Sequence, residues 1–293
     1  MKKIGVIGCG LMGYGIATNL LRKGYEVTVY DTNPEAVARV VENGGIRAFT
    51  VTELAKSSDV VILSLPTTDL VESVLLDERE GALHAMKPGS AVLDMSTNDV
   101  VKTREIEKSA SSVGISYFDC PVSGGPDGAS SGTLTIMVGG SEKEFQRVSS
   151  VLHAMGEHVE YLGPSGAGQI VKLCNNMVVG GIISLLGEAL LTGERAGISK
   201  EKLGELFQKG SAQTKVMDVF GPSIIHGTYD DVTFSLANML KDLSLYRNLA
   251  TEVGVPPTIS GAPHELFTRV NATGAGRRDS TAVAEFLEHE TQT

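Results

Sequence analysis

Short apolar segments alternate with amphipathic helical segments along the first half of the chain. Branched and aromatic residues predict strands at Lys3–Ile7, Tyr25–Tyr30, Val60–Leu65, Ala91–Met95 and Ile115–Phe118. Helical periodicity predicts helices between them, at Leu11–Lys23, Pro34–Asn43 and Asp99–Ser112. Because the run from Val60 to Leu63 has no polar position, we expect its strand to be buried on both faces, as in a parallel sheet covered by helices.

The alternating pattern ends near Gly163. Before this point, two further strands at Thr133–Val138 and His158–Tyr161 flank a helix at Glu142–Met155. Beyond it, a long and mostly apolar helix is predicted from Gly166 to Gly197, and every later segment is helical, at Lys200–Lys209, Gln213–Phe220, Leu236–Val253, Pro257–Asn271 and Thr281–His289. We therefore predict an α/β chain. A Rossmann-type, doubly wound N-terminal domain occupies residues 1–162 and an all-α domain residues 163–293, joined by the long interdomain helix.

The composition excludes several classes of function. The 34 glycines among 293 residues occur in short runs without a period of three, which predicts tight loops and excludes collagen. With 25 Lys and Arg against 35 Asp and Glu, the net charge of −10 argues against nucleic acid and against anionic membrane surfaces as partners. We also expect no membrane span, because no apolar run is judged to reach the ~18 residues that one needs.

The cysteine and histidine positions predict neither a disulfide framework nor a metal site. Cys9, Cys120 and Cys174 lie far apart without a Cys-x-x-Cys pair, which favours a reducing, cytoplasmic location. The six histidines show no metal-ligand spacing, so we expect no metal.

A glycine-rich segment follows the first predicted strand and opens the first helix, with the sequence Gly8-Cys9-Gly10-Leu11-Met12-Gly13. In a G-x-G-x-x-G of this kind the first glycine permits a tight turn, the second lets the backbone approach a pyrophosphate, and the third lets helix and strand pack closely. The helix N-terminus then offers N–H groups and the positive end of its dipole to the phosphates. A glycine-rich turn that binds no ligand would have the same sequence pattern.

Asp31 ends the second predicted strand, 18 residues after Gly13. A carboxylate at this place can accept hydrogen bonds from the adenosine ribose hydroxyls, and it would repel a 2′-phosphate. Because Thr32 and Asn33 stand where an arginine would bind that phosphate, we expect NAD rather than NADP. A second interpretation is that Asp31 only caps the helix that opens at Pro34.

A second glycine-rich segment, from Asp119 to Gly125, follows another strand of the predicted sheet. The Ser123 hydroxyl and the backbone N–H groups of Gly124 and Gly125 suit a small anion such as a carboxylate. A nucleophilic serine is disfavoured because the segment has no G-x-S-x-G elbow and no plausible histidine partner. A plain glycine-rich loop stays open as an interpretation.

The long helix carries Lys172 and Asn176 four positions apart, so the two residues share a face. Their neighbours are apolar, which predicts a partly buried lysine, and a buried lysine is costly unless it has a task or a partner. Desolvation or a nearby cation lowers a lysine pKa toward the range useful for acid–base catalysis. A lysine whose stem only covers apolar surface would fit the same pattern. Lys241 and Asp242, taken alone, indicate a surface ion pair.

Together and in this order, four segments resemble the β-hydroxyacid dehydrogenase family, which includes 3-hydroxyisobutyrate dehydrogenase and tartronate semialdehyde reductase. The family pattern is G-x-G-x-x-G, D-x-P-V-S-G-G, G-x-G-x-x-x-K-x-x-N-N and K-D-L, and it matches Gly8–Gly13, Asp119–Gly125, Gly166–Asn176 and Lys241–Leu243. The resemblance covers the chain from Ile4 to about Phe286.

The resemblance implies a role for each matched residue. Lys172 would be the catalytic acid/base, and the substrate-binding residues would be Ser123, Gly124, Gly125, Asn176 and Phe234. The cofactor-binding residues would be Gly8, Gly10, Leu11, Met12, Gly13, Asp31, Leu65, Pro66, Ser96, Thr97 and Lys241.

The activity implied is hydride transfer between NAD(H) and a small, carboxylate-bearing 3-hydroxy acid or its semialdehyde, with 3-hydroxyisobutyrate favoured. Tartronate, succinate and sulfolactaldehyde-type semialdehydes stay open, because one methyl or hydroxyl group gives only ~1–3 kcal/mol of discrimination. An imine reductase and a non-catalytic dinucleotide sensor are less favoured, because Lys172 argues against both. The aliphatic helices of the second half predict a homodimer or homotetramer.

Overall fold

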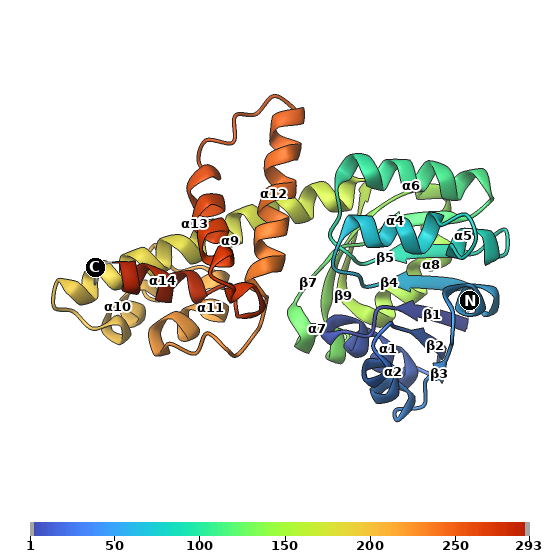
Figure 1. Cartoon of the computed structure of the whole chain (residues 1–293), viewed down its shortest axis with the longest axis horizontal. Coiled ribbons are helices and arrows are strands. Elements are labelled where there is room, and N and C mark those ends of the chain that lie inside the picture. The colour runs from blue at the N-terminus through green and yellow to red at the C-terminus, as the bar shows by residue number, and fades with distance from the viewer. Residues whose placement is uncertain (1–2, 291–293) are drawn as a thin grey trace. The chain divides into compact units, whose positions relative to one another are not determined.

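The computed structural model describes residues 3–290 and divides after Lys172 into two compact units. The first unit contains a nine-stranded sheet, with strands β1 (Lys3–Ile7), β2 (Glu26–Tyr30), β3 (Ile46–Arg47), β4 (Val60–Leu63), β5 (Ala91–Asp94), β6 (Ser116–Asp119), β7 (Val122–Ser123), β8 (Leu134–Gly139) and β9 (Gly156–Gly163). Their order is β3-β2-β1-β4-β5-β6-β8-β7, with β9 paired to β8 (Figure 1).

The six strands from β3 to β6 are parallel, which gives the predicted doubly wound Rossmann arrangement. The sequence predicts a strand at Thr133–Val138 without its direction, and in the structure β8 runs antiparallel to β6 and β7. The physical reason is the short connection between β7 and β8, which contains only α7 (Gly125–Ser131), whereas a parallel crossover needs a dozen or more residues.

Alternate side chains of the central strands build two separate apolar clusters, one on each face of the sheet. Val60 and Ile62 belong to the first cluster, whereas Val61 and Leu63 belong to the second. The first cluster is covered by α1 (Leu11–Arg22), α2 (Pro34–Val41) and α8 (Glu142–Met155), and the second by α3 (Val51–Ser57), α4 (Thr68–Leu76), α5 (Ala82–Ala85) and α6 (Val100–Ser112). The continuous apolar strands thus have the burial on both faces that their sequence predicts.

Helices make up the regular structure of the second unit's described residues, apart from an isolated β-bridge between Ser235 and Asp279. The unit contains most of α9 (Ala167–Arg195), followed by α10 (Lys200–Phe207), α11 (Lys215–His226), α12 (Leu236–Glu252), α13 (Gly261–Ala272), a short 3₁₀ helix at Ala275–Arg277 and α14 (Ala282–Glu290). One apolar cluster joins these helices, with Ile183, Leu243 and Phe267 fully buried in it. The fold class predicted from the sequence is confirmed.

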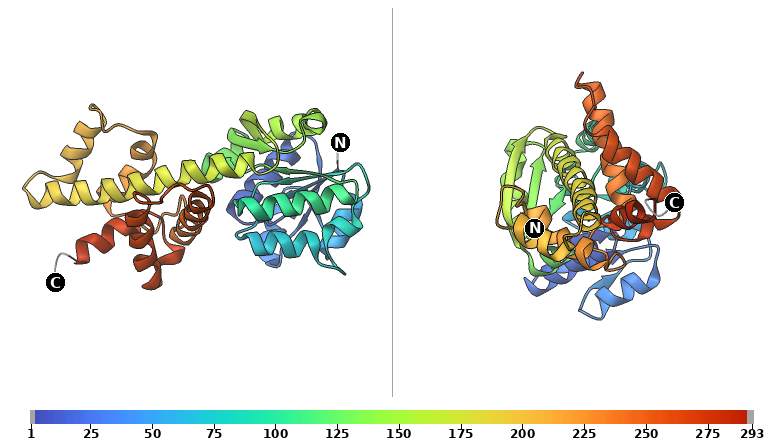
Figure 2. Two further views of the ribbon diagram at one scale, coloured as in Figure 1. Left: turned by 90° about the horizontal axis from the view of Figure 1, so that it is seen from above. Right: turned by 90° about the vertical axis from the view of Figure 1, so that its left-hand side faces the viewer.

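The long helix α9 begins in the first unit and continues as the first helix of the second (Figure 2). The predicted division at residues 162 and 163 therefore differs from the division between the compact units by ten residues. The difference arises because the first turns of α9 pack on the sheet of the first unit, where a Cβ atom at Gly168 would meet the Met137 carbonyl oxygen. The outer ends of both predicted domains, residues 1–2 and 291–293, lie outside the described residues.

The expectation that no segment has the length and apolarity of a membrane span is wrong for α9. This helix has 29 residues, and its most apolar window has a mean hydropathy of 1.6. Leu173, Ile183 and Leu190 of α9 are nevertheless fully buried. Of the apolar window, 39% is buried, and Val178 and Leu185 of the same helix are exposed.

Two glycines of α9 provide a matched test of how tightly its first turn packs. A Cβ atom at Gly168 would meet the backbone of Met137 and of Asp119, whereas a Cβ atom at Gly181 would have no neighbour within 4 Å. We expect Gly168→Ala to lower the free energy of unfolding by about 1–3 kcal/mol through overpacking. Gly181→Ala should raise it by about 0.5–1 kcal/mol through helix propensity. Urea denaturation checks both values, and equal effects would contradict the close packing at Gly168.

Candidate functional site

The candidate cofactor residues of the first unit lie at the carboxyl ends of its parallel strands. The strand order reverses between β1 and β4, and open α/β sheets bind their ligands at such a switch point. The glycine loop follows β1, Asp31 follows β2, Leu65 and Pro66 follow β4, and Ser96 and Thr97 follow β5. The predicted cofactor-binding residues of the first unit, from Gly8 to Thr97, therefore lie along one edge of the sheet.

The glycine loop has the shape that its spacing predicts. Gly8 has a φ of +94°, and a Cβ atom there would overlap the Ser64 carbonyl oxygen. A Cβ atom at Gly13 would overlap the Gly8 carbonyl oxygen, so the helix can begin this close to the strand only with glycine. At Gly10, by contrast, a Cβ atom would have no neighbour within 4 Å, so the chain leaves open space in front of the loop.

Asp31 holds the glycine loop through a hydrogen bond. The Cys9 N–H donates to Asp31 Oδ2 at 2.6 Å, and the Asn33 N–H donates to Oδ1 at 2.8 Å. The cap of α2 is Asn33, whose side chain accepts the Glu35 N–H, so the interpretation of Asp31 as the cap is wrong. Each carboxylate oxygen has a further lone pair, which leaves Asp31 able to accept hydrogen bonds from ribose hydroxyls.

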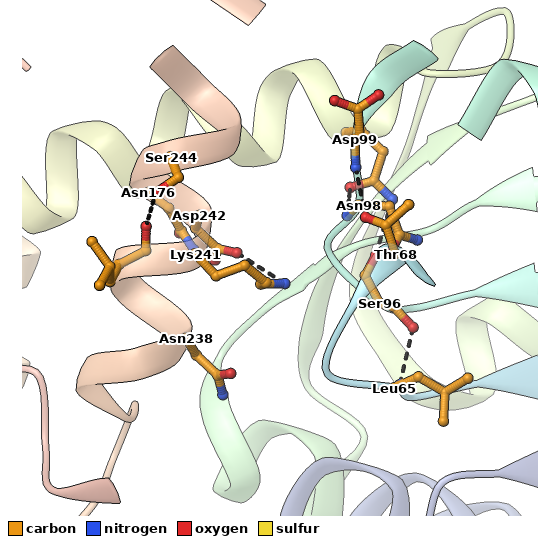
Figure 3. Close-up of polar contacts among 12 residues, drawn as sticks. Leu65, Thr68, Ser96, Asn98, Asp99, Asn176, Asn238, Lys241, Asp242 and Ser244 are labelled. Atoms are coloured by element: carbon orange, nitrogen blue, oxygen red, sulfur yellow. Dashed lines mark hydrogen bonds and ion pairs between the residues drawn. The ribbon is translucent and has the colours of Figure 1, made fainter. Parts of the chain in front are cut away.

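Ser96 connects the ends of β4 and β5. Its hydroxyl accepts the Leu65 N–H at 3.0 Å, which joins two segments that the sequence places beside a cofactor (Figure 3). The next turn is held in the same way, because the Asp99 N–H donates to Thr68 Oγ1 at 3.0 Å (Figure 3). The loops that carry Leu65 and Ser96 therefore keep a fixed spacing.

A fully buried carboxyl group, Asp94, supports this loop from below. It accepts the Ser96 N–H at 3.0 Å, the Asn98 side-chain amide at 2.8 Å and the Tyr117 hydroxyl at 2.8 Å. Desolvation raises the pKa of Asp94 to about 6, against the opposing effect of its bonds with Ser96 and Tyr117. Sequence reasoning missed Asp94, whose only signal is a polar residue at the end of an otherwise apolar strand.

Ser123, Gly124 and Gly125 lie where β7 passes into α7. Ser123 pairs with Thr135 of β8, and the two glycines have φ values of +126° and +63°, a region that favours glycine. The first N–H groups of a helix have no partner within it, so this turn can present backbone donors to an anion. The segment is therefore a sharply turned junction with donors at a helix start.

Lys172 lies in the second turn of α9 and is 8% exposed, so the predicted burial is confirmed. The first turn of α9 is held by Asp119, at the end of β6. Its carboxylate accepts the Gly166 N–H at 2.8 Å and the Gln169 N–H at 3.0 Å. Burial raises the pKa of Asp119, and these two N–H groups oppose the rise. The backbone that carries Lys172 is thereby fixed to the edge of the sheet.

In the second unit, Asn176 and Lys241 meet at Asp242. The Asn176 side-chain amide donates to Asp242 Oδ2 at 2.6 Å, and the Lys241 ammonium lies 3.2 Å from Oδ1 (Figure 3). Asp242 is 1% exposed, so the surface ion pair expected from the sequence is wrong. Sequence reasoning missed this residue, whose signal is its place three positions after the buried Met239 on α12.

Phe234 precedes α12 in a loop that Asp279 holds. The buried Asp279 carboxylate accepts the Thr233 N–H at 2.8 Å and the Phe234 N–H at 3.0 Å. The Ser280 N–H donates to the Phe234 carbonyl at 2.8 Å. The backbone of Phe234 is therefore bonded on both sides.

The first unit combines a glycine loop typical of dinucleotide sites with a buried lysine, Lys172, on α9. The glycine loop leaves open space at a helix N-terminus, and Asp31 supplies acceptors beside it. Within residues 3–290, no group of three or more His, Cys, Asp or Glu side chains is placed to hold a metal ion.

Two family models match the chain. The one described as the NAD binding domain of 6-phosphogluconate dehydrogenase matches residues 3–163. The one described as "NAD-binding of NADP-dependent 3-hydroxyisobutyrate dehydrogenase" matches residues 166–287. Both units are therefore of dinucleotide-binding families.

Similar proteins match over nearly the whole chain. A 2-(hydroxymethyl)glutarate dehydrogenase of Eubacterium barkeri is 36% identical, over 99% of this chain and 96% of its own length. A probable mitochondrial 3-hydroxyisobutyrate dehydrogenase of Dictyostelium discoideum is 35% identical, over 98% and 91%. The crystal structure of a 3-hydroxyisobutyrate dehydrogenase from Salmonella typhimurium has a TM-score of 0.89 at 29% identity, over 98% of this chain and 100% of its own.

The buried Asp94 predicts a pH dependence of stability. Its pKa of about 6 lies above that of an aspartate in the unfolded chain, so the folded protein keeps a proton that the unfolded chain releases. The contribution of Asp94 to the free energy of unfolding therefore falls as the pH rises from about 4 to about 6. As the pH rises across this window, the wild type should lose up to about 3 kcal/mol of unfolding free energy relative to Asp94→Asn. Urea denaturation at several pH values checks this, and a constant difference would contradict it.

Proposed function

The chain belongs to the β-hydroxyacid dehydrogenase family and is an NAD(P)-dependent oxidoreductase of hydroxyacids, and from this premise we propose that Lys172 is its catalytic acid/base. The observation that carries the proposal is a lysine buried on α9, in the same compact unit as the glycine loop. A lysine amine can take up or release a proton at a substrate oxygen, as general acid–base catalysis requires.

The residues at the carboxyl edge of the sheet fit a dinucleotide. Gly10 leaves open space in front of the loop, where Gly8, Leu11, Met12 and Gly13 would hold the pyrophosphate at the N-terminus of α1. Leu65, Pro66, Ser96 and Thr97 follow β4 and β5 and would line the nicotinamide, and Lys241 would contribute from α12. When bound, the nicotinamide supplies or accepts the hydride.

The substrate carboxylate would be held by Ser123, Gly124 and Gly125. The turn between β7 and α7 supports this role, because it combines a hydroxyl donor with N–H groups of a helix start. A carboxylate fixed at this turn sets the position of the hydroxyl-bearing carbon, and such orientation accounts for much of a catalytic rate enhancement. Asn176, with its amide fixed by Asp242, would orient the hydroxyl group, and Phe234 would wall the pocket.

Lys172 would then hold or release one proton at the substrate oxygen. During oxidation its amine takes the hydroxyl proton, and during reduction its ammonium returns a proton to the carbonyl oxygen. The bonds of Asp119 to the first turn of α9 support this role, since they hold the backbone that carries Lys172.

NAD is the proposed cofactor, in preference to NADP. The support is Asp31, whose carboxylate lies beside the glycine loop through its bond with the Cys9 N–H. A 2′-phosphate near that carboxylate would meet a like charge. Thr32 and Asn33, which follow it, supply no cation.

The proposed substrate class is a short 3-hydroxy acid, with 3-hydroxyisobutyrate first. The Dictyostelium relative supports this choice. The Eubacterium relative, named for 2-(hydroxymethyl)glutarate, adds a 3-hydroxy acid with a second carboxylate as another candidate. Tartronate, succinate and sulfolactaldehyde-type semialdehydes complete the set to be tested.

Reaction rates across this substrate set test the proposal. We expect NADH oxidation with methylmalonate semialdehyde to show the highest kcat/KM among the semialdehydes, and NAD⁺ reduction with 3-hydroxyisobutyrate to exceed that with 2-(hydroxymethyl)glutarate. Lys172→Ala should lower kcat by about 10²–10⁴-fold while NADH binding stays within a few-fold, because the lysine acts on a proton. Lys143→Ala, on an exposed lysine of α8, is the control. Near-normal turnover of Lys172→Ala would overturn the assignment.

The cofactor preference has its own test. Asp31→Ala should lower the ratio of kcat/KM for NAD to that for NADP, since it removes both the ribose acceptor and the charge that repels a 2′-phosphate. Asp69→Ala, on α4, is the matched control. A wild-type enzyme that already prefers NADP would contradict the proposal, as would an unchanged ratio in Asp31→Ala.

A further inference from the structure

Gln169 is a fully buried polar residue on the first turn of α9, three positions before Lys172. Its backbone N–H donates to Asp119 Oδ2 at 3.0 Å, which fixes the residue to the end of β6. Its side chain points to a different strand end. A buried amide needs partners for both its oxygen and its nitrogen, so those partners show what the residue holds together.

The side-chain amide of Gln169 makes two bonds with the loop after β5. Its Oε1 accepts the Asn98 N–H at 3.0 Å, and its Nε2 donates to the Ser96 carbonyl at 2.9 Å. These two backbone groups flank Thr97, so one amide spans the segment from Ser96 to Asn98. The bonds cross more than 70 positions of the chain, from the loop after β5 to α9.

The same segment is held from the other side by Asp94. That carboxyl accepts the Ser96 N–H at 3.0 Å and the Asn98 side-chain amide at 2.8 Å. Asp94 thus ties the loop to β5, and Gln169 ties it to α9. With Asp119 fixing the first turn of α9 to β6, the loop, the helix and two strand ends form one bonded frame.

The frame requires a side chain at position 169 that both donates and accepts a hydrogen bond. Only a side chain that donates and accepts at once can satisfy the Asn98 N–H and the Ser96 carbonyl together. A carboxylate would accept from Asn98 but set a second oxygen against the Ser96 carbonyl. An apolar side chain would leave both buried backbone groups unpaired, and each of them carries a free-energy cost.

We propose that Gln169 is a positioning residue, which fixes the Ser96–Asn98 segment to the turn of α9 that leads to Lys172. This inference rests on the proposed function, in which Ser96 and Thr97 line the nicotinamide and Lys172 exchanges the proton. Hydride and proton transfer need their donors in one geometry, and a misplacement of about 1 Å can cost 10²-fold in rate. The amide of Gln169 joins the two elements that carry these groups.

Two variants of similar volume separate positioning from packing. Gln169→Met keeps the shape and removes both bonds. We expect it to lower kcat, counted per NADH-binding site, by about 10²-fold. The dissociation constant of NADH should stay within about threefold, because the glycine loop and Asp31 are untouched. Gln146→Met, on an exposed position of α8, is the control.

Gln169→Glu should restore kcat at low pH, where the introduced carboxyl is protonated. The titratable groups packed around this network are the carboxyls of Asp94 and Asp119, the Tyr117 hydroxyl and the Cys120 thiol. Burial among them raises the pKa of an introduced carboxyl. Below that pKa the protonated acid donates to Ser96 and accepts from Asn98, as the amide does. The ratio of kcat of Gln169→Glu to that of the wild type should therefore rise at least fivefold from pH 8 to pH 6, whereas the ratio for Gln169→Met stays flat.

Amide hydrogen exchange of residues 95–99 tests whether the frame is intact, independently of catalysis. The Asn98 amide should exchange faster in Gln169→Met than in the wild type, because it loses its acceptor. Unchanged exchange would overturn the proposal. A kcat of Gln169→Met, counted per NADH-binding site, within threefold of the wild type would also overturn it. So would kcat ratios to the wild type that are equal for Gln169→Met and Gln169→Glu and constant from pH 8 to pH 6.

The outcome separates this inference from the function on which it rests. Loss of turnover in Lys172→Ala with normal turnover in Gln169→Met would leave the proposed function standing and overturn the role of Gln169. Normal turnover in Lys172→Ala would overturn the proposed function itself.

Discussion

The buried carboxylate of Asp119 is the constraint on which the arrangement of the first unit depends. It lies at the end of β6 and accepts two backbone N–H groups from the first turn of α9, those of Gly166 and Gln169. A helix start offers unpaired donors and the positive end of a dipole, so a carboxylate is well placed there. Removing it would leave two N–H groups unpaired beside the sheet, at about 1–3 kcal/mol each.

The close approach of α9 to the sheet explains the glycines around Asp119. A Cβ atom at Gly139, on β8, would lie 2.5 Å from Asp119 Oδ1. A Cβ atom at Gly168 would lie 2.9 Å from the Asp119 carbonyl oxygen. These glycines give the helix room to reach the carboxylate. Their role is therefore steric, whereas a Cβ atom at Gly10 would have no neighbour within 4 Å.

The parts of the fold that depend on local pattern could be predicted from the sequence. The glycine loop, the parallel strands and the buried Lys172 follow from spacing and periodicity within short segments. The antiparallel β8 could not be predicted in this way, because its direction is set by the short α7 connection. The burial of Asp242 was also missed, because a lysine beside an aspartate is typical of a helix surface.

The network of Asp94, Asn98, Asp119 and Gln169 shows the same limit more clearly. Each of these residues is polar and fully buried, and the sequence around it does not indicate which residue it bonds to. The pairing appears only when strand ends far apart in the chain meet at one edge of the sheet. Long-range polar contacts of this kind leave no periodic signal, so they need the fold to be known first.

The most direct test of the catalytic role of Lys172 is a crystal structure of the enzyme with NAD⁺ and 3-hydroxyisobutyrate, or with the 3-hydroxy acid that it turns over fastest. We expect the Lys172 amine at about 2.6–3.2 Å from the substrate hydroxyl oxygen. We also expect the substrate carboxylate on the N–H groups of the Ser123–Gly125 turn. A substrate hydroxyl bonded to another titratable side chain, with Lys172 out of reach, would contradict this role.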